Sequence, residues 1–383
     1  MRLPRLPIAV PPARHELVTS YVARLTTLHG MPFGELWEQL SVPQQPGAKR
    51  RLVIADRIAE ITSRSRRHLA GALVELRDPA PDWRLFRHDP QTGCPARTAR
   101  HPGGPVFVLL PHHRCVCVRH RYWIGPPDID HPAPRLDDLP DVVAAQRAHL
   151  RLVRRLGWAA AYDAVLTGFL ICAHHWSNIK PASDTDAWHR WHQRAHTLIP
   201  AGTARTTFSA SRLFASVYPE ALSIAALIGS PAWRTLAAGD TDHKARFYTE
   251  IGRRLGLPDY QPDPNGDAVA HWAHFDSWRL PSAPPKTFPD TRHFGSHQVG
   301  KTHPKSIERH ESSAFWFERR RVSRDGGTTL LHHRHIQPVL IREWSPTMAE
   351  YAGTIWASQT LSDLNKHQLP GGRRITRAIE RAG

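Results

Sequence analysis

The stretch GCPARTARHPGGPVFVLLPHHRCVCVRH, residues 93–120, contains three of the four cysteines of the chain. Cys117 and His120 form a C-x2-H step, which lets one tight turn offer two ligands to a tetrahedral zinc ion. Cys94 begins a second short turn, in which Arg97 stands where a zinc ribbon would carry another cysteine. An arginine side chain is not a zinc ligand. The stretch therefore predicts a degenerate zinc site.

The sequence does not identify the fourth ligand of this site. Cys115 is one replacement for the missing cysteine, and nearby imidazoles are others, namely those of His101, His112 and His113. An alternative is that Cys94, Cys115 and Cys117 are ordinary small buried residues of a fold that once held metal. The expected cofactor is Zn2+, and the expected metal residues are Cys94, Cys115, Cys117 and His120.

Two parts of the chain resemble the TniQ family, which comprises transposition-targeting proteins related to TnsD. The segments Gly93-Cys-Pro-Ala-Arg97, Leu110-Pro-His-His and Val116-Cys-Val-Arg-His120 are similar to the zinc-finger region of that family. Residues 11–25 resemble its opening, a proline-rich strand followed by a helix with the core Ser20-Tyr21-x-x-Arg24-Leu25. The match covers roughly the first third of the chain, and it departs from the family at Arg97 and in lacking a C-x2-C pair after His120.

The resemblance implies a DNA-binding protein that targets transposition. Such a protein reads a chromosomal site or a guide complex and recruits a transposase through an ATPase partner. The partners it implies are double-stranded DNA and transposon ATPase or transposase proteins, and homodimer formation stays open.

The charge of the chain points to a polyanionic partner. It has 51 lysines and arginines against 34 acidic residues, which gives a formal net charge of +17. A field of this sign attracts nucleic acid, the commonest polyanion met by a soluble protein. The alternative is contact with an acidic protein or a membrane surface.

The compartment predicted from the sequence is the cytoplasm. Four cysteines, three of them bunched, do not form a secreted disulfide framework in 383 residues. Residues 1–12 alternate apolar residues with arginine and proline and contain no signal-peptide core. The longest apolar run, residues 158–176, contains Asp163, His174 and His175, so it predicts a buried helix rather than a membrane span, with Cys172 in the core.

The first 80 residues predict two helical pairs. Apolar residues recur at helical spacing from Glu16, Gly30 ends that helix, and Pro32 starts a shorter one. After a polar loop, residues 53–61 and a helix capped by Ser63 form a helix-turn-helix shape, with Leu69, Ala70, Leu73 and Leu76 facing inward.

The second helix of this shape begins Arg64-Ser-Arg-Arg67, so its first turn offers guanidinium groups where a recognition helix meets DNA. The expected DNA-binding residues are Arg64, Arg66 and Arg67. Exposed arginines on an ordinary helical bundle are the alternative interpretation.

The remaining residues predict a mainly α fold with a few β elements. Residues 106–110 are predicted to form a strand beside the two short turns of the zinc site. Asp141 caps a helix at 142–156 whose outer face carries arginines, and a helical pair spans 219–228 and 231–238. A further helix covers 242–255, and Gly256 ends it. The predicted fold has helix-turn-helix-like N-terminal helices, a small zinc-ribbon-like β element, a central helical bundle, and a C-terminal β-hairpin plus helix.

Five regions follow from these patterns. They are an N-terminal helix-turn-helix-like region (1–80), a degenerate zinc-ribbon region and hinge (81–140), a helical domain (141–278), a linker (279–305), and a C-terminal basic hairpin and helix (306–383). The hairpin at 315–331 carries Arg319, Arg320 and Arg321, which could contact DNA like the wing of a winged helix or protect an exposed edge strand.

No enzyme motif is found in the sequence. There is no G-x4-G-K-[ST] loop, no G-x-S-x-G elbow and no H-E-x-x-H pair, and the acidic residues are scattered. A non-catalytic, transposition-targeting DNA-binding protein is the favoured hypothesis. The alternatives are a free-standing DNA-binding transcriptional regulator and a metal-dependent hydrolase or nuclease built on histidines such as those at 332–335.

Overall fold

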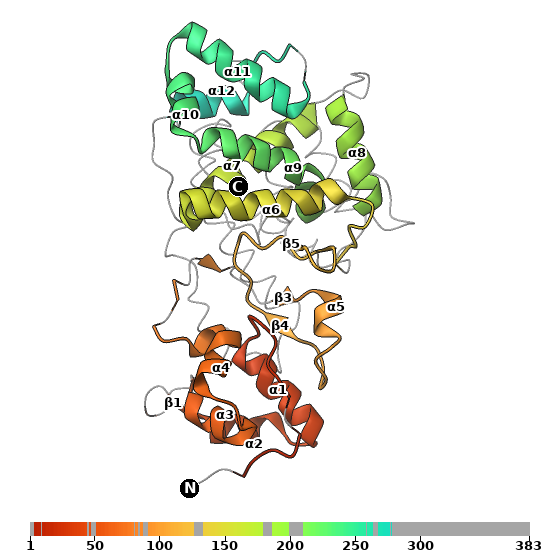
Figure 1. Ribbon diagram of the computed structural model, residues 1–383, viewed down its shortest axis with the longest axis vertical. Coiled ribbons are helices and arrows are strands. Elements are labelled where there is room, and N and C mark those ends of the chain that lie inside the picture. The colour runs from red at the N-terminus through yellow and green to blue at the C-terminus, as the bar shows by residue number, and fades with distance from the viewer. Residues whose placement is uncertain are drawn as a thin grey trace, which may run out of the picture. The chain divides into compact units, whose positions relative to one another are not determined.

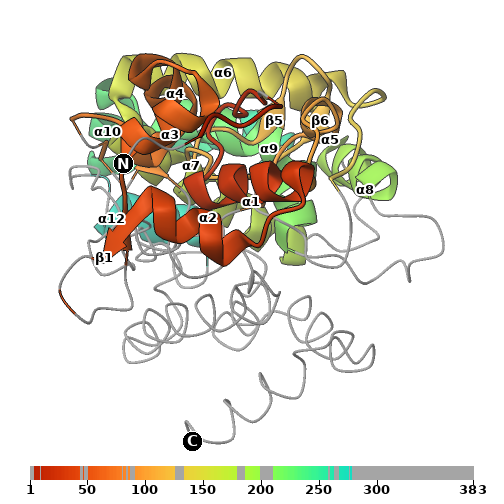
Figure 2. The same ribbon diagram turned by 90° about the horizontal axis from the view of Figure 1, so that it is seen from below.

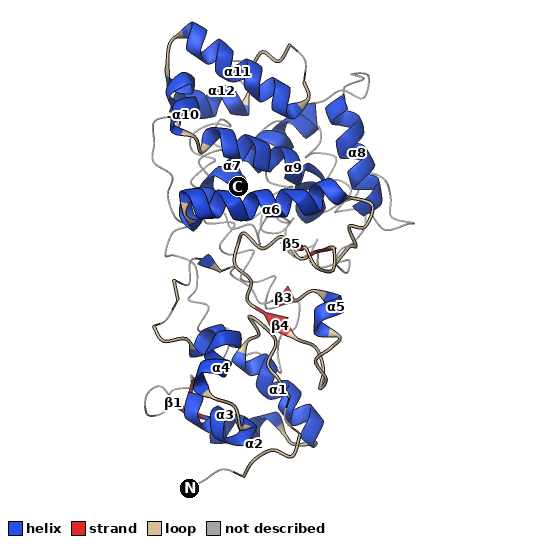
Figure 3. Ribbon diagram, viewed as in Figure 1, coloured by secondary structure: helices blue, strands red, loops and turns tan. Residues whose placement is uncertain are grey.

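The protein is mainly helical, with a few short strands (Figure 3). The computed structural model describes residues 4–8, 10–43, 46, 51–79, 81–82, 85–86, 91–125, 133–178, 186–198, 210–257, 259–262, 267–275 and 277. The described residues fall into two compact units, divided between His112 and His113.

Among its described residues, the first unit contains four helices, a single 3-10 turn, a one-turn helix and two short hairpins (Figure 1). The helices are α1 (Val18–His29), α2 (Phe33–Leu40), α3 (Ala55–Thr62), α4 (Arg66–Ala72) and the one-turn α5 (Pro95–Thr98), and the 3-10 turn is Val74–Leu76. Two antiparallel strand pairs join β1 (Ser41–Pro43) to β2 (Arg51–Val53) and β3 (Gln91–Thr92) to β4 (Phe107–Val108).

Apolar faces of α1 to α4 meet in one core. Tyr21, Leu25, Leu36, Ile58 and Leu69 are all buried there. The extended N-terminal segment runs along this body, because the Leu6 amide donates to the Ile61 carbonyl and the Tyr21 hydroxyl donates to the Val10 carbonyl. Two helical pairs were predicted in the first 80 residues, and the described residues there form α1, α2, α3 and α4.

A polar network lies under the first turns of α1. The Arg24 guanidinium donates to both carboxylate oxygens of Glu16, at 2.7 and 2.8 Å, and both side chains are buried. Glu16 also accepts from the Ala13 amide and the Ser20 hydroxyl, and Arg24 donates to the carbonyls of Pro102 and Pro11. The Ser20-Tyr21-x-x-Arg24-Leu25 pattern is thus a structural motif, whose polar members join α1 to the segments around it.

The second unit holds a small hairpin and seven helices among its described residues (Figure 1). β5 (Val116–Cys117) pairs with β6 (Tyr122–Trp123). The helices are α6 (Pro140–Leu156), α7 (Trp158–Asn178), α8 (Asp186–Leu198), α9 (Ala210–Ile228), α10 (Pro231–Ala238), α11 (Thr241–Leu255) and α12 (Ala268–Phe275).

The predicted buried helix is α7, which packs along α9 at the centre of this unit. A side chain at Gly168 would meet the Ala221 carbonyl of α9, so the glycine permits close backbone approach. Cys172 is fully buried on α7, and desolvation raises the pKa of its thiol well above the usual value, which confirms a core role.

Arg194 of α8 ties three helices together. It binds Asp141 of α6 at 2.6 Å and Glu220 of α9 at 2.6 Å, and its Nη1 donates to the Ser216 carbonyl at 2.9 Å. Ser216 lies in the turn before Pro219, where a proline removes one helical N–H. Arg194 therefore donates a hydrogen bond close to the point where Pro219 interrupts the hydrogen-bond pattern of α9.

Three predicted helix starts are wrong. Ser63 does not cap α4: it ends α3 in the left-handed conformation (φ 53°), and the Ser65 hydroxyl caps α4 by accepting from the His68 amide. Asp141 lies within the first turn of α6, because Pro140 already occupies the first helical position. Pro219 does not begin a helix, because α9 runs through it from Ala210.

Other expectations are met in part. Gly30 and Gly256 end α1 and α11 in the left-handed conformation, as predicted. The strand predicted at 106–110 shortens to β4, and α8 and α12 were not predicted. Within the described residues, no helix has both the length and the apolar character needed to cross a membrane. The predicted hairpin and helix beyond residue 305 lie outside the described residues.

Candidate functional site

The sequence predicted a helix-turn-helix shape here, and the structure has two short helices, α3 and α4, in this stretch. Eight residues of α3 are followed by a three-residue turn, Ser63 to Ser65, and then by the seven residues of α4. Ser63 takes the left-handed conformation that reverses the chain, and Ile58 and Leu69 pack the two helices into the core. The turn therefore holds the start of α4 in a fixed direction.

The first turn of α4 presents two arginines to solvent. Arg66 and Arg67 are both exposed. Arg66 lies 3.3 Å from Asp56, but at 66% and 68% side-chain exposure such a pair contributes little to stability, about 0–1 kcal/mol. Both guanidinium groups are therefore available to an anionic ligand.

Arg64 differs from its two neighbours because it belongs to the turn and is half-buried. Its Nη1 lies 3.5 Å from Nε2 of His68. Its charge also acts on Tyr21, whose pKa burial raises to about 12 while Arg64 and Arg24 oppose the rise. Part of the Arg64 guanidinium is thus directed at the core of the unit, whereas the sequence predicted three equivalent solvent-facing groups.

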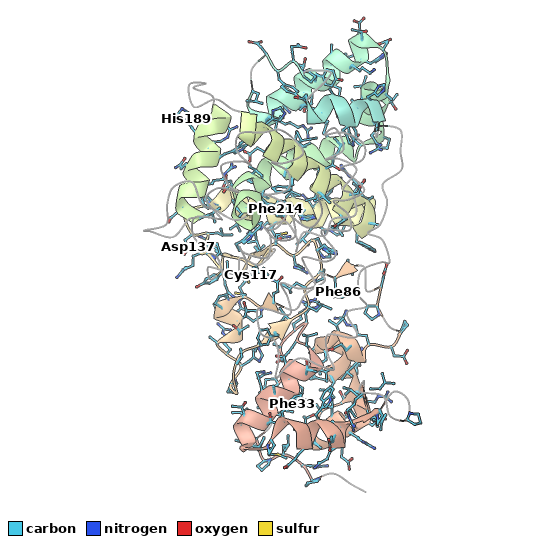
Figure 4. The ribbon with its side chains drawn as sticks, turned by 180° about the vertical axis from the view of Figure 1, so that it is seen from behind. Phe33, Phe86, Cys117, Asp137, His189 and Phe214 are labelled. Carbon is cyan, nitrogen blue, oxygen red and sulfur yellow. The ribbon has the colours of Figure 1, made fainter. Side chains whose placement is uncertain are left out.

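The C-x2-H step forms the predicted tight turn (Cys117 is labelled in Figure 4). The amides of His120 and Arg121 both donate to the Cys117 carbonyl, at 3.2 and 2.7 Å, and Arg121 adopts a positive φ of 52°. This turn places Cys117 Sγ 3.6 Å from His120 Nδ1. Zinc bonds of about 2.3 Å to sulfur and 2.0–2.1 Å to nitrogen, at the tetrahedral angle, require an S···N distance of about 3.6 Å.

Cys94 occupies the other short turn. It precedes α5, where the amides of Arg97 and Thr98 donate to its carbonyl at 2.9 Å. Arg97 is exposed, so it takes no part in a ligand set. Cys94, Cys117 and His120 form a group that could hold a metal ion, with ligand atoms all within 4.8 Å of one another.

Cys115 is not one of these three residues. It is buried, and its amide donates to Oε1 of Gln146 at 2.8 Å. The same oxygen accepts from the Val116 amide at 2.7 Å, and the Gln146 side-chain amide donates to the His113 carbonyl. Gln146 of α6 therefore fixes the segment that leads into Cys117. No local signal in the sequence points to this role, because it depends on a contact about 30 residues away along the chain.

The other predicted fourth ligands, His101, His112 and His113, are likewise outside the group that the described residues form. Arg319, Arg320 and Arg321 and the histidines at 332–335 lie outside the described residues. No protein-family model, curated protein or solved structure matches this chain.

Proposed function

We propose that this chain is a non-catalytic DNA-binding protein of the TniQ type, which recruits transposition machinery to DNA. The observation that carries the proposal is the α3–α4 pair, whose second helix begins with the exposed Arg66 and Arg67. A recognition helix contacts base edges with its N-terminal residues while the first helix crosses the backbone. The net charge of +17 supplies the long-range attraction that such a contact needs.

The metal part of the proposal is a structural zinc ion held by Cys94, Cys117 and His120. Two thiolates and one imidazole are ligands that zinc accepts, and the 3.6 Å separation of Cys117 Sγ and His120 Nδ1 fits two corners of its tetrahedron.

We expect Arg66→Gln/Arg67→Gln to weaken binding to duplex DNA about tenfold per arginine at ~0.1 M salt, because each phosphate contact contributes a salt-dependent factor of that order. Fluorescence anisotropy with a labelled duplex measures the loss. Arg253→Gln is the matched control, because Arg253 is equally exposed but belongs to α11 and pairs with Glu250. Failure of the wild-type protein to bind duplex DNA at ~50 mM salt would refute the proposal.

The transposition role needs a separate test. Co-purification of a transposon ATPase or transposase with the tagged chain supports targeting, as do genes for such proteins beside its own gene. DNA binding without either of these supports the free-standing regulator.

We expect purified protein to carry about one equivalent of zinc, and Cys117→Ser to carry almost none. Elemental analysis measures both, and chelation should lower the melting temperature of the wild type, since structural zinc sites contribute directly to folding. Cys172→Ala is the control: it also removes one buried thiol, but it lies on α7 and outside the group, so its zinc content should stay near one. Wild-type protein free of metal would remove the ion from the proposal.

A further inference from the structure

Helix α6 carries a second basic surface, in the unit that does not contain α4. The helix lies at the surface of that unit, in front of α7 and α9 in Figure 1, and it is labelled again in Figure 2. The α6 stripe consists of four exposed arginines, which are Arg147, Arg151, Arg154 and Arg155. The opposite side of the helix is buried, with Gln146, His149 and Leu152 packed inward.

The spacing of the stripe is regular. Arg147, Arg151 and Arg155 follow one another at four-residue intervals, so consecutive members are separated by about 6 Å along the helix axis. Arg154 lies beside them, and the four together occupy about 100° of the circumference at 100° per residue. One row of guanidinium groups therefore extends over about 12 Å of α6.

No carboxylate neutralises this row within the part of the chain that the structure describes. The only acidic residue of α6 is Asp141, whose carboxylate is bound by Arg194 at 2.6 Å. Arg154 and Arg155 donate to backbone carbonyls, of Leu150 and Ala226, at 3.4 and 3.3 Å. Like charges at four-residue spacing repel, so the row destabilises the helix until an anion covers it.

Helix α11 shows what an arginine pair looks like when the protein neutralises it. Glu250 stands three residues before Arg253 and four before Arg254, and it binds both guanidinium groups at 2.7 Å. The two arginines lower the pKa of Glu250 to about 2, with the hydrogen bond from Arg253 as the largest cause. Among the residues that the structure describes, none does this for the α6 stripe, which distinguishes the stripe from a surface arranged for stability alone.

We propose that the α6 stripe binds the phosphate backbone of duplex DNA, as a contact separate from α4. This rests on the proposed DNA-binding function and adds a positioning surface to it. Phosphate contacts hold a protein on the duplex without reading its sequence, and arginine forks suit phosphate oxygens. The partner is a nucleic acid because a regular row of cations, with no carboxylate partner among the described residues, fits a polymer with one charge at each short, regular step.

The test compares Arg147→Gln/Arg151→Gln with the wild type in anisotropy titrations against a duplex, from ~50 to ~250 mM salt. Affinity should fall on the order of 10- to 100-fold at ~0.1 M salt, and the slope of log K against log salt should shrink by about 1.8 for two lost contacts. Arg147→Lys/Arg151→Lys should keep most of the slope, because a phosphate contact needs the charge. Arg253→Gln should match the wild type in both quantities.

The outcomes separate this inference from the proposed function. If the α6 variant keeps the affinity and slope of the wild type while the Arg66/Arg67 variant loses affinity, the stripe does not bind DNA and the proposed function stands. If the wild type binds no duplex, both fail. If the α6 variant loses binding to poly-glutamate and none to DNA, the stripe serves an acidic protein and the inference is wrong.

Discussion

Arg24→Met should destabilise the first unit by about 3–5 kcal/mol, the largest effect on stability that we expect from a single substitution. The variant keeps much of the side-chain volume and removes the charge. It leaves the Glu16 carboxylate fully buried, with the Ser20 hydroxyl and the Ala13 amide as its remaining donors among the described residues. An uncompensated buried charge accounts for most of the cost, because neither solvent nor another cation reaches it.

The matched control is Arg253→Met on α11. Arg253 also forms a two-bond contact with a carboxylate, to Glu250 at 2.7 and 2.8 Å, but its side chain is 69% exposed. Screening and side-chain entropy limit such a pair to about 0–1 kcal/mol. The two substitutions therefore change the same atoms and differ in burial.

Amide exchange of α1 in increasing urea measures the loss locally, which matters because the two units need not unfold together. The double variant Glu16→Gln/Arg24→Met should recover part of the loss, since it removes the stranded charge. A loss below about 1 kcal/mol for Arg24→Met would contradict the structural role assigned to the motif.

Arginines of three physical classes occur among the described residues, and the sequence does not distinguish them. Arg24 and Arg194 are buried and bound to carboxylates. Arg253 and Arg254 are paired with Glu250 on α11. The α4 pair and the α6 stripe face solvent. Net charge alone therefore overestimates the surface available to DNA, because part of the positive charge is used inside the fold.

The sequence predicted a helix end correctly where the backbone conformation of a single residue determines it. Gly30 and Gly256 end helices because glycine readily adopts positive φ. The predictions failed where two neighbouring residues compete for one role, as Ser63 and Ser65 do at α4, and where tertiary packing tolerates a proline inside a helix, as at Pro219.

The candidate metal site, like the helix ends, was predictable only where local spacing decides the structure. The C-x2-H step fixes Cys117 and His120 in one turn, so spacing alone brings them together. Spacing does not decide whether Cys115 joins them, because residues two apart share a face only within a regular strand, and β5 begins after Cys115. The Gln146 contact that holds the Cys115 backbone comes from another element and could not be read from the pattern.

The Glu75→Gln substitution should make the stability of the first unit depend less on pH between about 4.5 and 7. Oε2 of Glu75 accepts from the Val18 amide at 2.6 Å, at the first position of α1. Burial raises the pKa of this carboxyl from 4.5 to about 7, and the nearby Glu16 adds to the rise. The hydrogen bond from Val18 and the positive end of the helix dipole favour the charged form, but desolvation outweighs them.

The sign of the effect follows from proton uptake. Between pH 4.5 and about 7 the folded state holds a proton on Glu75 that the unfolded state has lost, so the free energy of unfolding falls as the pH rises through this window. Below pH 4.5 both states are protonated and the full contribution is present. By about pH 8 the wild type should have lost about 1–3 kcal/mol relative to its value at low pH from this residue alone. The glutamine side chain keeps an acceptor for Val18 and carries no charge.

The measurement is the difference in free energy of unfolding between variant and wild type, at four pH values from about 5 to about 8, from urea titrations of α1 amide exchange. The difference should grow in favour of the Glu75→Gln variant as the pH rises and level off near about pH 8. Glu35→Gln, the same change at an exposed position in the first turn of α2, should stay within about 0.5 kcal/mol of the wild type throughout. A difference that is flat with pH would mean that the Glu75 carboxylate stays solvated when the unit folds, and that its contact with Val18 is an ordinary charged cap.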